Sequence, residues 1–327
     1  MIFSPRFSLA TVRPTGTQWL AKLLRALLFP FAGIVVFLML WQGLAQSITT
    51  SLGQFPGPAD VMHQGGVLVD EYHEQKEKAA RFYARQDQRN AKKLAENPEA
   101  KVKWRTYTGK PTFLDQIIVS LKTVAFGFVI ASVIAIPLGI ACGLSDTFYQ
   151  AVNPIIQVFK PVSPLAWLPL VTMVVSATYV TEDPFFAKSF LNSGFTVALC
   201  CLWPTVINTS VGVASIDRDL INVGRVIKLP RLTNIAKIVL PSALPMVFTG
   251  LRLSLATGWM VLIAAEMLSQ NPGLGKFIWD EFQNGSSNSL SRIMTAVVVI
   301  GLIGFVLDRL MLVLQRRFSW DKAADLK

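Results

Sequence analysis

Six long apolar segments, separated by polar loops, constrain this chain more than any other feature of its sequence. Each is close to the ~20 residues that a helix needs to cross the hydrocarbon core of a bilayer, where the backbone must satisfy its own hydrogen bonds. The pattern predicts an all-α, polytopic membrane protein with about six transmembrane helices. The segments lie at about residues 27–47, 117–143, 155–176, 193–214, 246–268 and 292–314.

Composition also favours a membrane protein. Only 16% of the 327 residues are charged and 52% are hydrophobic, whereas about a quarter of the residues of soluble domains are charged. The net charge of +11 favours cytoplasmic loops beside anionic lipid, because no nucleic-acid-binding motif accompanies it. With only two histidines, no metal site is predicted. The cysteines lie in apolar runs and are interpreted as small buried hydrophobes: Cys142, Cys200 and Cys201.

Lysine and arginine cluster before the first apolar segment, between the fourth and fifth, and after the sixth. The positive-inside rule therefore places both termini and the loop at 215–245 in the cytoplasm, with the chain in a bacterial cytoplasmic (inner) membrane. Small residues at 45–47 resemble a signal-peptide cleavage site, but the apolar core before them is nearly of full span length, which favours an uncleaved helix. We expect a cytoplasmic segment, a membrane domain with an external insert, and a cytoplasmic tail at 1–26, 27–320 (insert 60–112) and 321–327.

The insert is strongly charged, although this topology places it outside. Residues 70–110 carry eleven Lys or Arg and seven Asp or Glu, and long loops translocate largely regardless of charge. Helix-forming residues predominate, and Glu74–Lys78 and Glu77–Arg81 have i,i+4 spacing, so we expect a solvated external helix. This helix is interpreted either as a charged face without a ligand or as a docking surface for an external partner.

A polar, basic stretch, NVGRVIKLPRLTNIAKIVLP at residues 222–241, separates the fourth and fifth apolar segments. Apolar residues recur at helical spacing on both sides of Pro230, which interrupts the helical pattern. The spacing predicts short helices at 217–228 and 231–239. Their apolar stripes consist of Leu220, Val223 and Ile227, and of Leu232, Ile235 and Val239.

This stretch resembles the cytoplasmic coupling loop of type I ABC importer permeases, whose pattern is E-A-A, three residues, G, nine residues and I-x-L-P. Ile238, Leu240 and Pro241 match the end of the pattern, whereas its start departs. Lys228 stands at the place of the glycine, which adopts positive φ more readily than lysine does. The missing glutamate removes an ionic contact that the family often has. The residues at the places of E-A-A are Asn222, Val223 and Gly224.

Other stretches resemble the nitrate/sulfonate/bicarbonate branch of the same family, in family order and spacing. The resemblance implies a type I ABC importer permease fold with a cytoplasmic coupling helix. It implies transport of a small inorganic anion, with nitrate or nitrite favoured over bicarbonate, and bicarbonate over alkanesulfonate or taurine. The alternative from another class is a membrane scaffold whose basic loop binds lipid. The stretches are 120–145, 160–170, 208–220 and 250–267.

The resemblance also implies the partners and the coupling residues. The partners are separate ABC ATPase subunits, a second permease copy in a homodimer, an external solute-binding protein or lipoprotein, and membrane lipids, but no nucleic acid. No G-x-x-x-x-G-K-[ST] pattern occurs, so ATP and Mg²⁺ are expected on the ATPase and no cofactor on this non-catalytic chain. Coupling to the ATPase is assigned to Asp219, Asn222, Val223, Gly224, Lys228, Leu229, Pro230 and Arg231.

Polar and ionisable side chains at membrane depth are candidates for the translocation path. Lys122 and Arg252 lie near segment ends, where they could instead extend to the interface. Glu266 ends the fifth segment near the outer surface, where water or a base could satisfy it. The third segment carries three prolines between residues 160 and 170, which fit a broken helix beside a water-filled path or a packed kink. The path candidates are Lys122, Asn208, Thr209, Arg252, Thr257 and Glu266.

Overall fold

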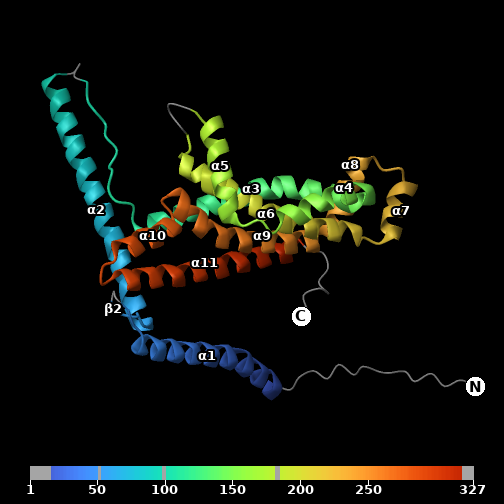
Figure 1. The fold of residues 1–327 in the computed structure, drawn as a ribbon, viewed down its shortest axis with the longest axis horizontal. Coiled ribbons are helices and arrows are strands. Elements are labelled where there is room, and N and C mark those ends of the chain that lie inside the picture. Colours follow the sequence, from blue (N-terminus) through green and yellow to red (C-terminus); the bar gives the residue numbers. More distant parts are fainter. Residues whose placement is uncertain (1–15, 51–52, 98–100, 181–184, 319–327) are drawn as a thin grey trace, which may run out of the picture.

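The structure, a computed structural model, describes residues 16–50, 53–97, 101–180 and 185–318, and this part of the chain is almost entirely helical (Figure 1). Within it, five helices are long and apolar enough to cross a membrane, and the count becomes six if one bent pair is a single span. The predicted all-α architecture with about six spanning helices is therefore confirmed. The five helices are α1 (Gly16–Ser47), α3 (Phe113–Leu144), α6 (Lys188–Ala214), α9 (Leu240–Ser269) and α11 (Ser289–Phe318).

The bent pair lies where the sequence predicted the third apolar segment, at 155–176, for which a broken helix and a packed kink are both open. α4 (Asp146–Phe159) and α5 (Pro164–Thr178) meet at an angle of 102°. α4 ends at Phe159, just before Pro161, and proline is disfavoured in a helix interior. Pro164 is the first residue of α5, a position where the missing amide hydrogen of proline costs nothing. The side chain of Ser163 caps α5. Of the two interpretations of the proline-rich stretch, the broken helix describes the structure.

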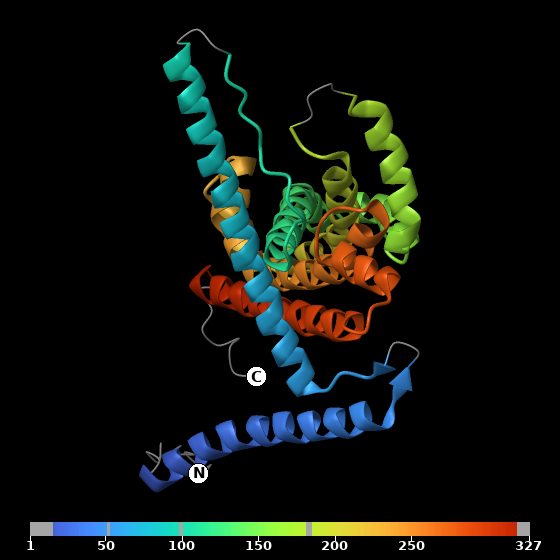
Figure 2. The same cartoon turned by 90° about the vertical axis from the view of Figure 1, so that its left-hand side faces the viewer.

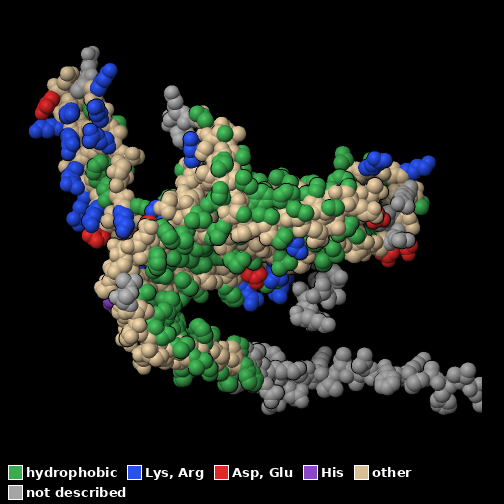
Figure 3. Space-filling view, viewed as in Figure 1, with side chains coloured by type: hydrophobic (Ala, Val, Ile, Leu, Met, Phe, Trp, Pro, Cys, Tyr) green, Lys and Arg blue, Asp and Glu red, His purple; other side chains and the backbone are tan. Residues whose placement is uncertain are grey.

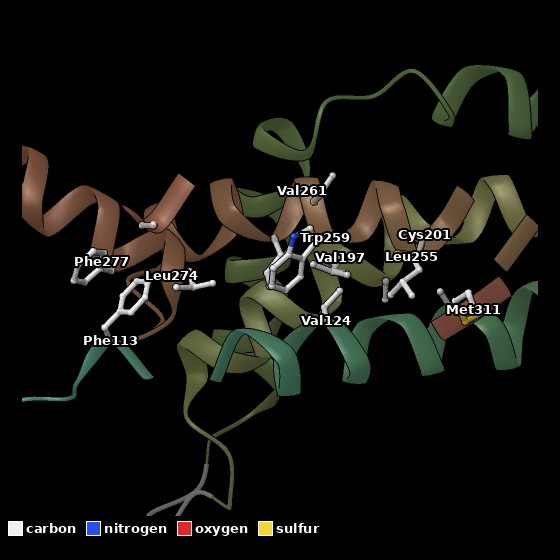
Figure 4. Close-up of a cluster of buried hydrophobic side chains, with 14 of the residues drawn as sticks. Phe113, Val124, Val197, Cys201, Leu255, Trp259, Val261, Leu274, Phe277 and Met311 are labelled. Atoms are coloured by element: carbon white, nitrogen blue, oxygen red, sulfur yellow. The ribbon is translucent and has the colours of Figure 1, made fainter. Parts of the chain in front are cut away.

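α3, α6 and α9 pack together at the centre of the bundle, and small residues let their backbones approach closely. A Cβ atom at Gly127 would lie 2.5 Å from the carbonyl oxygen of Gly194, and one at Gly139 would lie 2.6 Å from Cβ of Thr209. The indole Nε1 of Trp259 donates to the main chain of α11 at 3.0 Å. Figure 4 shows the buried side chains around this indole, among them Val124, Val197, Cys201 and Leu255.

At one end of the bundle, short helices connect α6 to α9 (Figure 1). They are α7 (Arg218–Val226), α8 (Arg231–Asn234) and η1 (Ile235–Val239), a π-helical turn that continues directly into α9. The helices predicted at 217–228 and 231–239 are therefore present, the first with a slightly earlier end. They lie far from the insert, at the end opposite to α2.

At the other end, α2 (Pro58–Glu96) lies across the bundle at a steep angle to the spanning helices (Figures 1 and 2). A short hairpin of β1 (Thr49–Thr50) and β2 (Gly53–Gln54) joins it to α1. The charged helix expected in the insert is therefore present. A short helix that the sequence did not predict, α10 (Leu274–Asn284), lies in the loop between α9 and α11.

Arg292 of α11 fastens α2 and α10 to the bundle. Its Nη1 and Nη2 donate to the two carboxylate oxygens of Glu71 on α2, at 2.7 and 2.8 Å. Its Nε lies 2.8 Å from Oε1 of Glu281 on α10. The side chains of Arg292 and Glu281 are only 17% and 8% exposed, so each charge depends on its partner for neutralisation.

Replacing Arg292 with methionine leaves both carboxylates without their cation. We expect the free energy of unfolding to fall by about 2–3 kcal/mol. We also expect protease to cut residues 76–110 more readily, because α2 loses its anchor. Chemical unfolding in detergent and limited proteolysis measure the two effects. The control is Lys78→Met, which removes an exposed pair with Glu74 and should cost less than about 1 kcal/mol. Equal loss of stability in both variants would contradict the anchoring role.

Candidate functional site

The loop between α6 and α9 is a compact helical hairpin. At its start, Oδ1 of Asp217 accepts a hydrogen bond from the amide of Asp219 at 3.0 Å, which satisfies a free amide of the first turn of α7. At its turn, the amide of Leu229 donates to the carbonyl of Gly224 at 3.1 Å. Local hydrogen bonds therefore define both the start and the end of α7.

The turn depends on the backbone of Lys228, whose φ is 50°. This is the left-handed region, which costs a residue with a Cβ atom about 1 kcal/mol. Lys228 stands where the family pattern has glycine, and it adopts the conformation that a glycine would adopt more cheaply. Pro230 follows with φ −54° and ψ 145°, and α8 begins at Arg231. The turn that the family builds with glycine is thus retained with lysine.

Gly224 holds the two arms of the hairpin together. A Cβ atom at this position would lie 2.6 Å from Oδ1 of Asn234 and 3.1 Å from Cδ1 of Ile238. Any larger residue would therefore separate α7 from α8 and η1. Gly224 is buried, in contrast to most of the other predicted coupling residues.

Most of the predicted coupling residues face solvent. Leu229 is half-buried, and the side chain of Val223 lies outside the described residues. The hairpin therefore brings the predicted set together at one end of the molecule, with polar and basic groups on its surface. The exposed members are Asp219, Asn222, Lys228, Pro230 and Arg231.

The apolar stripes of the hairpin divide into two groups. Ile235 and Val239 pack against the bundle, as expected for the root of α9. Leu220, Ile227 and Leu232 remain exposed, and Leu232 is 82% exposed. Val226, which the sequence analysis did not single out, is 79% exposed beside them. Apolar side chains grouped at the solvated end of a membrane protein are typical of a surface that binds another protein.

The candidate path residues do not gather at one place in the described structure. Nε and Nη2 of Arg252 donate to Asp308 of α11 at 3.1 and 2.9 Å, so this half-buried cation is paired with a carboxylate of the neighbouring helix. Thr209 is buried against Gly139 at the α3–α6 contact, and Lys122 is exposed on α3. Two others, Asn208 and Thr257, bond to the main chain of their own helices.

Glu266 is fully buried, which differs from the expected contact with water or a base. Its carboxylate accepts from the hydroxyl of Ser120 at 2.8 and 2.9 Å and from the amide of Gly275 at 3.0 Å. A Cβ atom at Gly273 would collide with this carboxylate. The segment NPGLGKF, residues 271–277, therefore wraps around the carboxylate of Glu266 where the chain passes from α9 to α10. Its glycines were the signal that sequence reasoning missed.

Within the described residues, no group of three or more His, Cys, Asp or Glu side chains could hold a metal ion. The features of the site are thus a hairpin with exposed apolar and basic side chains at one end of the bundle and hydrogen-bonded polar pairs further along it.

Known proteins resemble this chain over most of its length. Residues 135–320 match the family described as binding-protein-dependent transport system inner membrane component. The nitrate import permease protein NrtB of Leptolyngbya laminosa is 40% identical over 195 residues, which are 60% of this chain and 65% of that protein, just under two thirds of its length. The bicarbonate transport system permease protein CmpB of Synechococcus elongatus is 33% identical over 305 residues, 93% of this chain and 94% of that protein.

A solved structure of the MetNI methionine ABC transporter, in an inward-facing conformation, has the same fold. Its TM-score is 0.54 at 15% identity, and the match covers 63% of this chain and 95% of that chain. The resemblance to type I ABC importer permeases is therefore confirmed by sequence and by fold. Because the family match covers more than half of the chain, this multi-pass membrane protein belongs to the family of binding-protein-dependent transport system inner membrane components.

Proposed function

We propose that this chain is the permease subunit of an ATP-driven importer whose solute is a small inorganic anion, nitrate or nitrite. The observation that supports this function best is the hairpin between α6 and α9, which presents apolar and basic side chains at one end of the spanning bundle. Similarity to a nitrate import permease protein, at 40% identity, supports the choice of solute.

The hairpin is the coupling element to an ATPase. Burying an exposed apolar side chain such as Leu232 or Ile227 in a groove of the ATPase stabilises the complex by about 1.5–3 kcal/mol. The exposed cations Lys228 and Arg231 favour an acidic rim around that groove. The opposite interpretation, a basic loop that only binds lipid, would leave the rigid turn at Lys228 without a role.

Force on the hairpin passes directly into the membrane. α8, η1 and α9 form one helical run from Arg231 to Ser269 without a break. When two ATPase subunits close on ATP and Mg²⁺, they move the hairpin and thereby tilt α9. The path then opens on the far side, and hydrolysis on the ATPase resets it.

The other subunits follow from this scheme. A second copy of the chain pairs with the first to enclose the path, and a solute-binding protein or lipoprotein delivers the anion at the end where α2 and α10 lie. The chain is placed in the cytoplasmic (inner) membrane of a bacterium, with both termini and the hairpin in the cytoplasm. ATP hydrolysis belongs to the separate subunits.

Bicarbonate is the second candidate solute. The similarity to the bicarbonate permease CmpB extends over 93% of this chain, whereas that to NrtB of Leptolyngbya laminosa extends over 60%. The longer match is less identical, so the two observations favour different anions. Transport measurements separate them.

Uptake by the reconstituted transporter tests the function. Proteoliposomes with the chain, its ATPase subunits and its solute-binding protein should accumulate labelled nitrate only when ATP is present. Nitrite should compete strongly, and bicarbonate and taurine weakly, if the site selects nitrate-like anions. Stronger competition by bicarbonate than by nitrite would reassign the solute. Absence of any ATP-dependent anion uptake would refute the proposed function.

A charge in the apolar surface of the hairpin should weaken the contact with the ATPase. Leu232→Glu changes an 82% exposed side chain, so folding should be unaffected. We expect a loss of about 2 kcal/mol of binding, or roughly 30-fold weaker affinity for the ATPase subunits. Titration of purified ATPase onto the chain in nanodiscs measures it. Val180→Glu, at a position that is 78% exposed after α5, is the control. If both variants bind the ATPase like the unmodified chain, the docking role fails.

The left-handed turn provides an independent test. Lys228→Gly removes the strain of φ 50° and should keep transport while raising the stability of the chain by up to about 1 kcal/mol. Lys228→Val places a β-branched residue in the left-handed region, and it should lower stability and uncouple ATP hydrolysis from uptake. Thermal unfolding and the ratio of ATP hydrolysed to anion imported measure the pair. Identical behaviour of the two variants would show that the turn geometry has no part in coupling.

A further inference from the structure

The distal part of α2 leaves the bundle and forms, with the segment that returns from it, a projecting arm. We define the arm as residues 76–96 of α2 and the return segment 101–110. The bundle-facing buried residues of α2, Val61, Gln64 and Leu68, all lie before the arm. Figures 1 and 2 show the arm extending beyond the spanning helices. Nothing in the packing of the bundle therefore requires an arm of this length.

The arm is nevertheless a defined structure. The side-chain amide of Gln86 bonds twice to the main chain of Arg105, at 3.0 and 3.3 Å. The amide of Asn90, one turn further along, donates to the carbonyl of Lys103 at 3.3 Å. Closer to the bundle, the amide of Tyr107 donates to the hydroxyl of Tyr83 at 3.1 Å. These bonds hold the return segment along one side of the helix.

A basic cleft of about 390 Å³ lies between the helix and the return segment. Its helical cations are spaced four residues apart, so they lie on one face of α2. The cations of the return segment occur at every second residue and line the other side of the cleft. Like charges at these spacings repel each other. Among the described residues that line the cleft, none is acidic. The cations are Arg85, Arg89, Lys93, Lys101, Lys103 and Arg105.

The base of the arm shows the opposite arrangement. Lys78 and Arg81 pair with Glu74 and Glu77 one turn before them, and the hydrogen bond from Lys78 lowers the pKa of Glu74. The chain therefore neutralises its cations where the arm begins but concentrates them in the cleft. A cleft of one charge sign attracts a partner of the other sign and raises its rate of association.

We propose that the basic cleft of the arm docks an acidic surface of the external solute-binding protein. This inference rests on the proposed function, because that function requires such a protein at this end of the molecule. Each close pairing of a carboxylate on the binding protein with a cation of the cleft positions the protein over the bundle. The repulsion among the cleft cations is then relieved by the partner.

A lipid surface is the less suitable partner. Lys and Arg side chains are spread over much of the visible face of the arm (Figure 3). A helix that lies on a bilayer also needs a continuous apolar face. The large apolar side chains exposed on the described part of the arm are scattered over both elements, at Tyr83, Leu94 and Trp104.

Charge reversal within the cleft tests the inference. The test variant is Arg89→Glu with Lys103→Glu, and the control is Lys76→Glu with Lys92→Glu, which changes the net charge equally at exposed positions of the arm outside the cleft. Both are assembled with the ATPase subunits in nanodiscs, and the affinity for the purified solute-binding protein of the same transporter is measured. We expect at least about tenfold weaker binding for the cleft variant, little change for the control, and an affinity of the unmodified transporter that falls steeply with salt.

The outcomes separate the two proposals. If the unmodified transporter imports no anion, the proposed function and the inference built on it both fail. If it imports anion and the cleft variant binds the solute-binding protein as tightly as the control does, the inference alone fails. Repeating the measurement in nanodiscs of neutral lipid and of phosphatidylglycerol tests the lipid surface. A defect confined to phosphatidylglycerol would assign the cleft to lipid headgroups and overturn the docking of a protein. Unchanged ATP hydrolysis without the solute-binding protein shows that the cleft variant is folded.

Discussion

The close packing of α3, α6 and α9 is the contact on which the rest of the structure depends. In a bilayer the hydrophobic effect does not drive helices together, so van der Waals contact between closely spaced backbones must do it. Gly127 and Gly139 permit that approach, and the indole of Trp259 adds a hydrogen bond to α11. In the proposed importer, this close packing would let α9 transmit a displacement from one end of the bundle to the other, because its neighbours resist bending.

The two ends of α9 are built differently, and the difference fits a transmitting element. At one end the helix continues through η1 into an exposed hairpin whose surface is apolar and basic. At the other end the chain wraps tightly around the buried carboxylate of Glu266, with Ser120 and Gly275 satisfying it. In the proposed importer, an exposed hairpin at one end of α9 and a closed, hydrogen-bonded turn at the other would convert a displacement of the hairpin into a tilt of the helix.

Much of this structure could be predicted from local sequence patterns. Hydropathy identified the spanning helices because each has its signal within its own ~20 residues, and the family spacing identified the hairpin with its turn at Lys228. Features that depend on distant residues could not be found in this way. From the sequence alone, Arg252 is a candidate for the path, because the sequence does not show which residue pairs with it. Its partner, Asp308, lies 56 residues away on another helix. The break before α5 remained open because prolines permit both a kink and a break.

Arg292 links three elements through a single guanidinium, and this has a mechanical consequence. Because Glu71 and Glu281 share the one cation, α2 and α10 cannot shift independently at this end of the bundle. A force applied near the far end of α2 would produce a torque about Arg292 and would act directly on α11. In the proposed importer, docking of the solute-binding protein on the arm would therefore act on α11 through this one guanidinium, with no change needed in the other spanning helices.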